Sequence, residues 1–152
     1  MLLEFYAIGK GSNLRNLSAR GFVSDSELRS LNIGFVIAPD PTPTFSSSRL
    51  VLLRAAGPGL RAFGVANVVP APRIELFSGT TLLAQNTGIG TAPNGAAIAD
   101  ATAVFGAFPF VAGSADSALL LQLPAGEYIM RVSSALGTSG IALAELYTNI
   151  GF

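Results

Sequence analysis

Short apolar runs that alternate with turns rich in Gly and Pro constrain the fold of this chain more than any other sequence feature. The runs have the length of β-strands, and the turns follow one another at nearly regular spacing. Parallel βαβ units need a helix between most strands, whereas only 96–105 has a helical pattern here. The sequence therefore predicts an all-β fold, an antiparallel β-sandwich of jelly-roll or immunoglobulin-like type with about eight or nine strands and one short helix near 96–105.

The individual runs predict where each strand lies. Arg49–Ala55 is apolar on both faces, so we expect it at the centre of a sheet. Leu31–Ile37 alternates and buries every second residue, while Gly34 within it suggests a bulge or a close backbone approach. Leu14–Val23 also alternates, and we expect Phe22 to continue its buried side after the glycine that precedes it.

Three more predictions come from the second half of the chain. Arg73–Phe77 and Thr81–Gln85 flank Ser-Gly-Thr and are typical of a hairpin. Ala118–Leu123 and Glu127–Ser134 flank a Pro-Ala-Gly turn, and Gly140–Tyr147 is expected to close the sheet.

The helix candidate is followed by the densest aromatic cluster in the chain. Asn94 is a candidate cap for the helix, and Gly106 ends it. Phe105, Phe108 and Phe110 then follow at irregular spacing. We interpret them as a core plug beneath the helix rather than as a surface for stacking sugars.

The two ends of the sequence carry similar segments. Leu2–Gly9 reads LLEFYAIG and Leu143–Gly151 reads LAELYTNIG, so both contain Glu-x-Tyr followed by Ile-Gly. Such an echo suggests one unit of a tandem array, in which the chain begins with the closing strand of the previous unit. The alternative is that two short strands look alike because strand composition is narrow.

The echo suggests a division into 1–13, an N-terminal strand and linker available for donation, and 14–152, the β-sandwich module. Because the module already contains its closing strand, 2–8 is surplus. We expect it to dock on an edge of its own sheet or, in the interpretation that we favour, on a neighbouring chain. The expected contact residues are Leu3, Phe5, Tyr6 and Ile8 on the donated strand and Leu143, Leu146 and Tyr147 on the closing strand.

Catalytic chemistry has few residues to draw on. The sequence contains no His and no Cys, which excludes a Ser-His-Asp triad, thiol chemistry and His- or Cys-based metal sites. Asp25 and Glu27 are the closest acid pair and would make at most a weak calcium site, while Asp40, Asp100 and Asp116 are isolated. We therefore expect no enzyme activity, no catalytic residues, no metal and no cofactor.

Charge and hydropathy limit the classes of binding partner and the cellular locations that fit this sequence. Nine acidic residues balance nine basic ones, which gives no electrostatic reason to bind nucleic acid or an anionic membrane. No apolar run reaches the roughly 18 residues of a membrane span, and the first residues do not read as a signal peptide. Charged residues make up only 12% of the chain. Such a surface suits a secreted or cell-surface protein, or a subunit whose faces are covered by neighbours.

Several of these segments resemble a known repeat. Arg49–Val65, Pro72–Asn86 and Leu123–Tyr147 resemble a repeat module of large secreted bacterial proteins, and Asn16–Val23 resembles its opening strand. The LPAGEY stretch is also similar to the bacterial pre-peptidase C-terminal domain, a jelly-roll-like sandwich. The resemblance implies an accessory, non-enzymatic extracellular module, often present in tandem. Family members often carry acids where this chain has Gln85–Gly88, which puts any family metal site in doubt here.

Together these observations predict a non-catalytic extracellular structural module that self-associates through strand addition into a fibre or a tandem surface array. Its partners would be other copies of itself or adjacent repeats, with cell-surface polysaccharide as a further candidate. The alternative is a carbohydrate-binding accessory module of a secreted hydrolase. Exposed aromatic rings in a groove would favour the alternative, and an N-terminal strand packed on a neighbouring chain would favour self-assembly.

Overall fold

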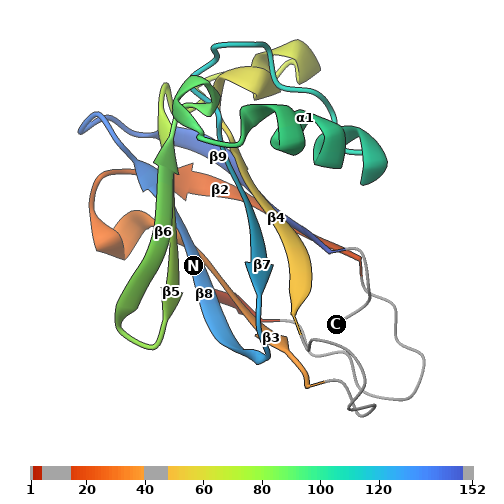
Figure 1. Cartoon of the computed structure of the whole chain (residues 1–152). Helices are drawn as coiled ribbons and strands as arrows, with labels where there is room; N and C mark the ends of the chain where they lie inside the picture. The colour runs from red at the N-terminus through yellow and green to blue at the C-terminus, as the bar shows by residue number, and fades with distance from the viewer. Residues whose placement is uncertain (1, 5–14, 40–47, 149–152) are drawn as a thin grey trace.

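The computed structural model describes residues 2–4, 15–39 and 48–148, which form a sandwich of two β-sheets (Figure 1). One sheet has five strands in the order β1-β3-β8-β5-β6, and the other has four in the order β2-β9-β4-β7. Neighbouring strands run antiparallel, except that β1 runs parallel to β3. The predicted all-β antiparallel sandwich is confirmed. The strands are β1 (Leu2–Glu4), β2 (Asn16–Val23), β3 (Leu31–Ile37), β4 (Arg49–Ala56), β5 (Pro72–Ser78), β6 (Thr81–Thr87), β7 (Ser117–Leu123), β8 (Gly126–Ser134) and β9 (Gly140–Thr148).

The helical elements are short. They comprise one α-helix, α1 (Gly95–Val104), and three 3-10 turns, η1 (Glu27–Arg29), η2 (Pro58–Phe63) and η3 (Ile89–Thr91). The helix predicted near 96–105 is confirmed, although Asn94 does not cap it with its side chain and instead donates a hydrogen bond to the carbonyl of Leu120 at 3.1 Å. None of the described helices is long and apolar enough to cross a membrane.

The main core lies between the two sheets and follows from alternation along the strands. In β3 the residues Leu31, Ile33, Phe35 and Ile37 point inward and are buried, as the sequence pattern predicted. The register between β3 and β8 runs without a break past Gly34, so the bulge suggested there is absent.

The prediction for Phe22 was wrong. Its side chain is 52% exposed, whereas Val23 is buried in the core. Alternation continues unbroken through Gly21, which occupies an inner position. A Cβ at this position would lie 2.8 Å from Leu31 Cδ2, so a larger residue would require Leu31 to shift. Gly21 leaves space for the leucine side chain and does not change which residues of β2 face inward.

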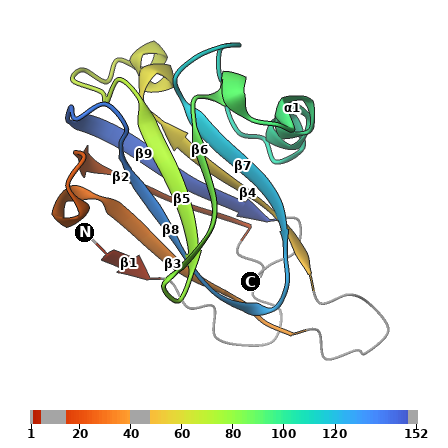
Figure 2. The ribbon, with the colours of Figure 1, turned by 60° about the vertical axis from the view of Figure 1, so that its left-hand side comes forward.

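Strand β4 is central and buried on both faces, as predicted. On its inner face Val51 and Leu53 join the main core. On its outer face Leu52 packs with Ile98 of α1 and with Ala118. Figure 2 shows α1 lying over the outer side of the four-stranded sheet, across β4 and β7. This cover explains why β4 is apolar on both sides.

The two predicted turns in the second half have different roles. β5 and β6 form the expected hairpin, with a register shift between Leu76 and Phe77. The Pro-Ala-Gly turn instead carries the chain from β7 in one sheet to β8 in the other. Alternation alone does not distinguish these two uses of a turn.

The N-terminal strand lies at the edge of its own sheet. β1 pairs in parallel with β3, with Leu2 opposite Asn32 and Glu4 opposite Gly34 (Figure 2). This is the first of the two docking positions stated above and not the neighbouring chain that we favoured. Of the predicted contact residues, Leu3 lies in β1, and positions 5, 6 and 8 lie outside the described residues.

A prediction arises at the start of β9. A Cβ added to Gly140 would lie 2.7 Å from the carbonyl oxygen of Asn67 and closer still to the nitrogen of Val69. This backbone is held by Ile141, which donates to Asn67 at 2.8 Å and accepts from Val69 at 2.9 Å. We expect Gly140→Ala to lower the unfolding free energy by about 1–3 kcal/mol in urea denaturation. Gly95→Ala, where a Cβ meets nothing within 4 Å, is the control and is expected to leave stability unchanged or slightly higher. Equal stability of the two variants would show that the 67–69 backbone moves away freely.

Candidate functional site

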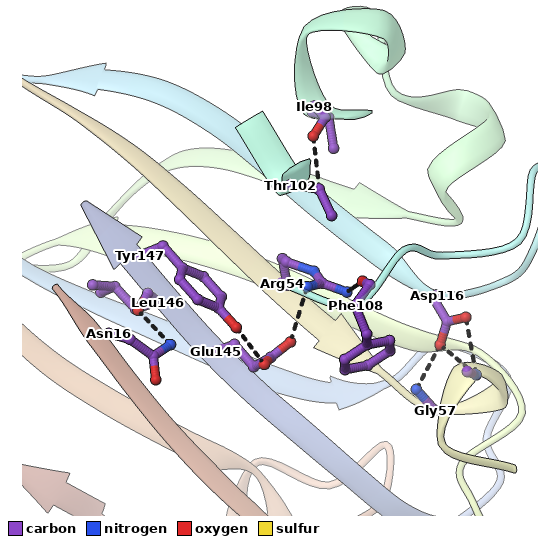
Figure 3. Close-up of polar contacts among 11 residues, drawn as sticks. Asn16, Arg54, Gly57, Ile98, Thr102, Phe108, Asp116, Glu145, Leu146 and Tyr147 are labelled. Atoms are coloured by element: carbon purple, nitrogen blue, oxygen red, sulfur yellow. Dashed lines mark hydrogen bonds and ion pairs between the residues drawn. The ribbon is translucent and has the colours of Figure 1, made fainter. Parts of the chain in front are cut away.

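A buried arginine marks the most unusual chemistry in the described structure. Arg54 lies in β4 on the outer face of the four-stranded sheet and has 0% exposed surface (Figure 3). Because β4 is flanked by β9 and β7, the side chain has no sheet edge within reach and must find its partners beneath the covering segments. Burying a guanidinium is costly unless it is paired, so its neighbours define a site.

The charge partner of Arg54 comes from the closing strand. Glu145 in β9 lies directly opposite Arg54 in the sheet register. Its Oε2 is 3.5 Å from Arg54 Nη1, and its Oε1 accepts a 2.7 Å hydrogen bond from the Tyr147 hydroxyl (Figure 3). Arg54 Nη2 also donates to the carbonyl of Phe108 at 2.6 Å. The network therefore joins β4, β9 and the segment after α1.

Aromatic rings enclose the guanidinium. Its carbon is 4.5 Å from the centroid of Phe108 and 4.1 Å from that of Phe110, within the range of cation–π contacts. Phe105 stacks on Tyr147 with centroids 5.9 Å apart. All three phenylalanines are partly buried. Phe105 and Phe110 pack with the cluster beneath α1, as predicted, whereas Phe108 packs beside η2, and Phe108 and Phe110 cover a buried cation.

Electrostatics at this site follow from burial. Desolvation lowers the pKa of Arg54, and the Glu145 carboxylate opposes that shift. Burial, reinforced by the hydrogen bond to Glu145, raises the pKa of Tyr147 to about 12. At neutral pH the arginine stays cationic and the phenol stays protonated.

A second buried acid fixes the loop beside this site. Asp116 has 0% exposed surface, and its carboxylate accepts hydrogen bonds from the backbone N–H of Gly57 at 2.7 Å and of Gly59 at 3.0 Å, and from the Ser114 hydroxyl at 2.9 Å. It thereby joins the start of η2 to the start of β7. Asp116 was predicted to stand apart from other acids, and its partners are indeed backbone groups and a serine hydroxyl, which gives it a structural role that the sequence did not reveal.

An open groove adjoins the buried network. It has a volume of about 510 Å³ and crosses the outer face of β2 and β9 next to η2. Phe63 stands in it with 62% of its surface exposed and contacts Phe108 in a T-shaped arrangement at 5.0 Å. Its lining residues are Ser18, Arg20, Leu60, Phe63, Val65, Phe108, Leu143 and Glu145.

The predicted closing-strand residues lie in β9, but the strand places them on different faces. Leu146 is buried in the core between the sheets, whereas Leu143 and Tyr147 lie on the outer face, Leu143 in the groove and Tyr147 under Phe105. Asp25 is exposed on the turn after β2, and Glu27 begins η1. Within residues 2–4, 15–39 and 48–148, no three acidic side chains gather as potential metal ligands.

Comparison with known proteins identifies a related fold and no family. No family model matches the chain, and no curated protein is similar to it in sequence. The resemblance to the pre-peptidase C-terminal domain therefore stays a hypothesis. Among solved structures, the periplasmic inhibitor PliG of g-type lysozyme from Aeromonas hydrophila superimposes with a TM-score of 0.51. The two are 9% identical, and the match covers 97% of this chain and 96% of that one. The likeness supports the fold alone.

Proposed function

We propose that this chain is a non-catalytic module of an extracellular protein and that it works by joining copies of its own fold through strand addition. The observation that carries the proposal is the role of Glu145. On the closing strand this residue is buried opposite Arg54 and linked to Tyr147. A Glu-x-Tyr sequence is therefore the pattern that pairs with Arg54 at the β9 position.

The N-terminal segment 2–8 carries the same pattern, with Glu4 and Tyr6 at the matching places. In its own chain, Arg54 is already paired with Glu145. In another copy Arg54 is likewise paired with that copy's own Glu145, so 2–8 would take the β9 position there by replacing that strand. Main-chain hydrogen bonds would supply the strength of such a contact, and alternating side chains would set its register.

The edge contact of β1 supports the same proposal. Within the part of the chain that the structure describes, it pairs three residues, Leu2–Glu4, with part of β3, so few of these bonds are lost if β1 leaves its own sheet. Short strand pairings of this kind contribute little stability by themselves. The neighbour PliG is a protein inhibitor, and a role that depends on a macromolecular partner fits this fold.

Self-association is testable by sedimentation over a range of concentrations. We expect the intact chain to assemble and Phe5→Asp to raise the dissociation constant at least about 100-fold, since burying an unpaired carboxylate costs several kcal/mol. Phe22→Asp introduces the same charge at an exposed position of β2 and is expected to leave assembly unchanged. A monomeric intact chain at high concentration would contradict the proposal.

A second candidate function is binding of carbohydrate, as in an accessory module of a secreted hydrolase. The specific observation in its favour is the groove with the exposed ring of Phe63. Aromatic rings that present one face to solvent are common anchors in ligand sites.

A further inference from the structure

We propose that the groove beside η2 binds one unit of an anionic saccharide chain, with Phe63 as the stacking surface and Arg20 as the partner of the sugar carboxylate. The inference names the ligand class for the second candidate function and is independent of strand addition. Three observations support it. The ring of Phe63 is exposed but fixed, the side chain of Arg20 has no partner among the described residues, and the main chain of β2 and β9 beneath the groove is already paired.

The ring of Phe63 is exposed but not loose. It ends η2, whose first turn is fixed by the hydrogen bonds from Gly57 and Gly59 to Asp116. The T-shaped contact with Phe108 holds the ring from the protein side. Phe108 is in turn fixed by Arg54 through its carbonyl and its ring. An apolar ring that keeps most of its surface in water at such a rigid place is suited to cover an apolar ligand face.

The charge at the groove is positive. Arg20 in β2 is exposed, and its side chain makes no hydrogen bond or ion pair within the described ranges. Glu145 also lines the groove, but its charge is balanced by Arg54 and its Oε1 by Tyr147. Arg20 is therefore the uncompensated charge, and a guanidinium binds a carboxylate through two parallel hydrogen bonds.

The floor of the groove favours a sugar over a peptide. Ser18 and Arg20 of β2 lie opposite Glu145 and Leu143 of β9 in a continuous antiparallel ladder. The main chain beneath the groove is thus used within the sheet, while extended peptides are bound largely through free main-chain groups at a strand edge. A sugar acid presents an apolar C–H face to Phe63, a carboxylate to Arg20 and hydroxyls to Ser18.

Calorimetric titration with a short oligogalacturonate and with its carboxyl-reduced, neutral counterpart tests the proposal. We expect the uronate to bind and the neutral sugar to bind at least about tenfold more weakly. Arg20→Gln should remove this preference, and Phe63→Ala should weaken binding of the uronate by about tenfold or more. Both side chains are exposed, so thermal unfolding of the variants should match that of the parent chain.

Phe22→Ala is the matched control, because Phe22 is an exposed phenylalanine of β2 that does not line the groove. It should bind the uronate as the parent does. Equal affinity for the two sugars, undiminished binding by Phe63→Ala, absence of heat with the uronate, or displacement of the sugar by an acidic peptide of higher affinity would each overturn the proposal. The assembly of Phe63→Ala, measured in parallel, separates this outcome from failure of strand addition.

Discussion

Replacing Arg54 with methionine is expected to lower the unfolding free energy by about 3–5 kcal/mol. Methionine fills much of the space between Phe108 and Phe110, so little of this loss comes from a cavity. The main cost is that Glu145 stays buried without a counter-charge. Urea denaturation followed by circular dichroism measures the change.

A second substitution separates charge from packing. Glu145→Gln in the Arg54→Met background removes the orphaned charge and keeps an oxygen for the Tyr147 hydroxyl. Since replacing a whole buried ion pair is often neutral, we expect the double variant to regain at least about half of the lost stability. A single variant that loses less than about 1 kcal/mol would show that Glu145 is solvated or protonated at little cost.

Asp116→Ala is expected to have the next largest effect, about 2–5 kcal/mol of unfolding free energy. Hydrogen bonds to a charged acceptor contribute about 1.5–3 kcal/mol each, and buried donors left without a partner are costly. Here the backbone N–H groups of Gly57 and Gly59 and the Ser114 hydroxyl all lose their acceptor. Thermal and urea unfolding give the magnitude.

The matched control is Asp100→Ala, which removes an exposed acid from α1 and should change stability by no more than about 0.5 kcal/mol. Asp116→Asn should fall between the two, because it keeps one acceptor oxygen but turns the other into a donor. If Asp116→Ala is no less stable than Asp100→Ala, then water takes over the loop contacts and the carboxylate does not fix η2.

Sequence pattern was a good guide to the elements of this fold. Alternation with a period of two identified the inward residues of β3, and an apolar run on both faces identified β4 as central. Pattern gave no information on which sheet a strand joins. The turn before Gly126 looks like a hairpin turn yet crosses between layers, because its flanking strands find better partners elsewhere.

The candidate site was largely missed, and the reason is physical. Arg54 and Glu145 lie far apart in sequence and look like ordinary surface charges, and only the register between β4 and β9 brings them together. Asp116 has few side-chain partners, so no residue pattern reveals it. One signal was available: Arg54 lies between apolar residues in the interior of the most apolar strand of the chain, and such a position indicates a buried charge that needs a partner.

The position of β9 has a consequence for how the module is made. It is the last described strand along the chain, yet it lies between β2 and β4 and is the neighbour that connects them. During synthesis those two strands must wait with open edges until β9 has left the ribosome, which delays folding and exposes them to other chains. A similar strand that is synthesised earlier can pair with β2 and β4 in place of β9. In a polyprotein of such units, the order in which strands leave the ribosome would therefore decide which strands pair.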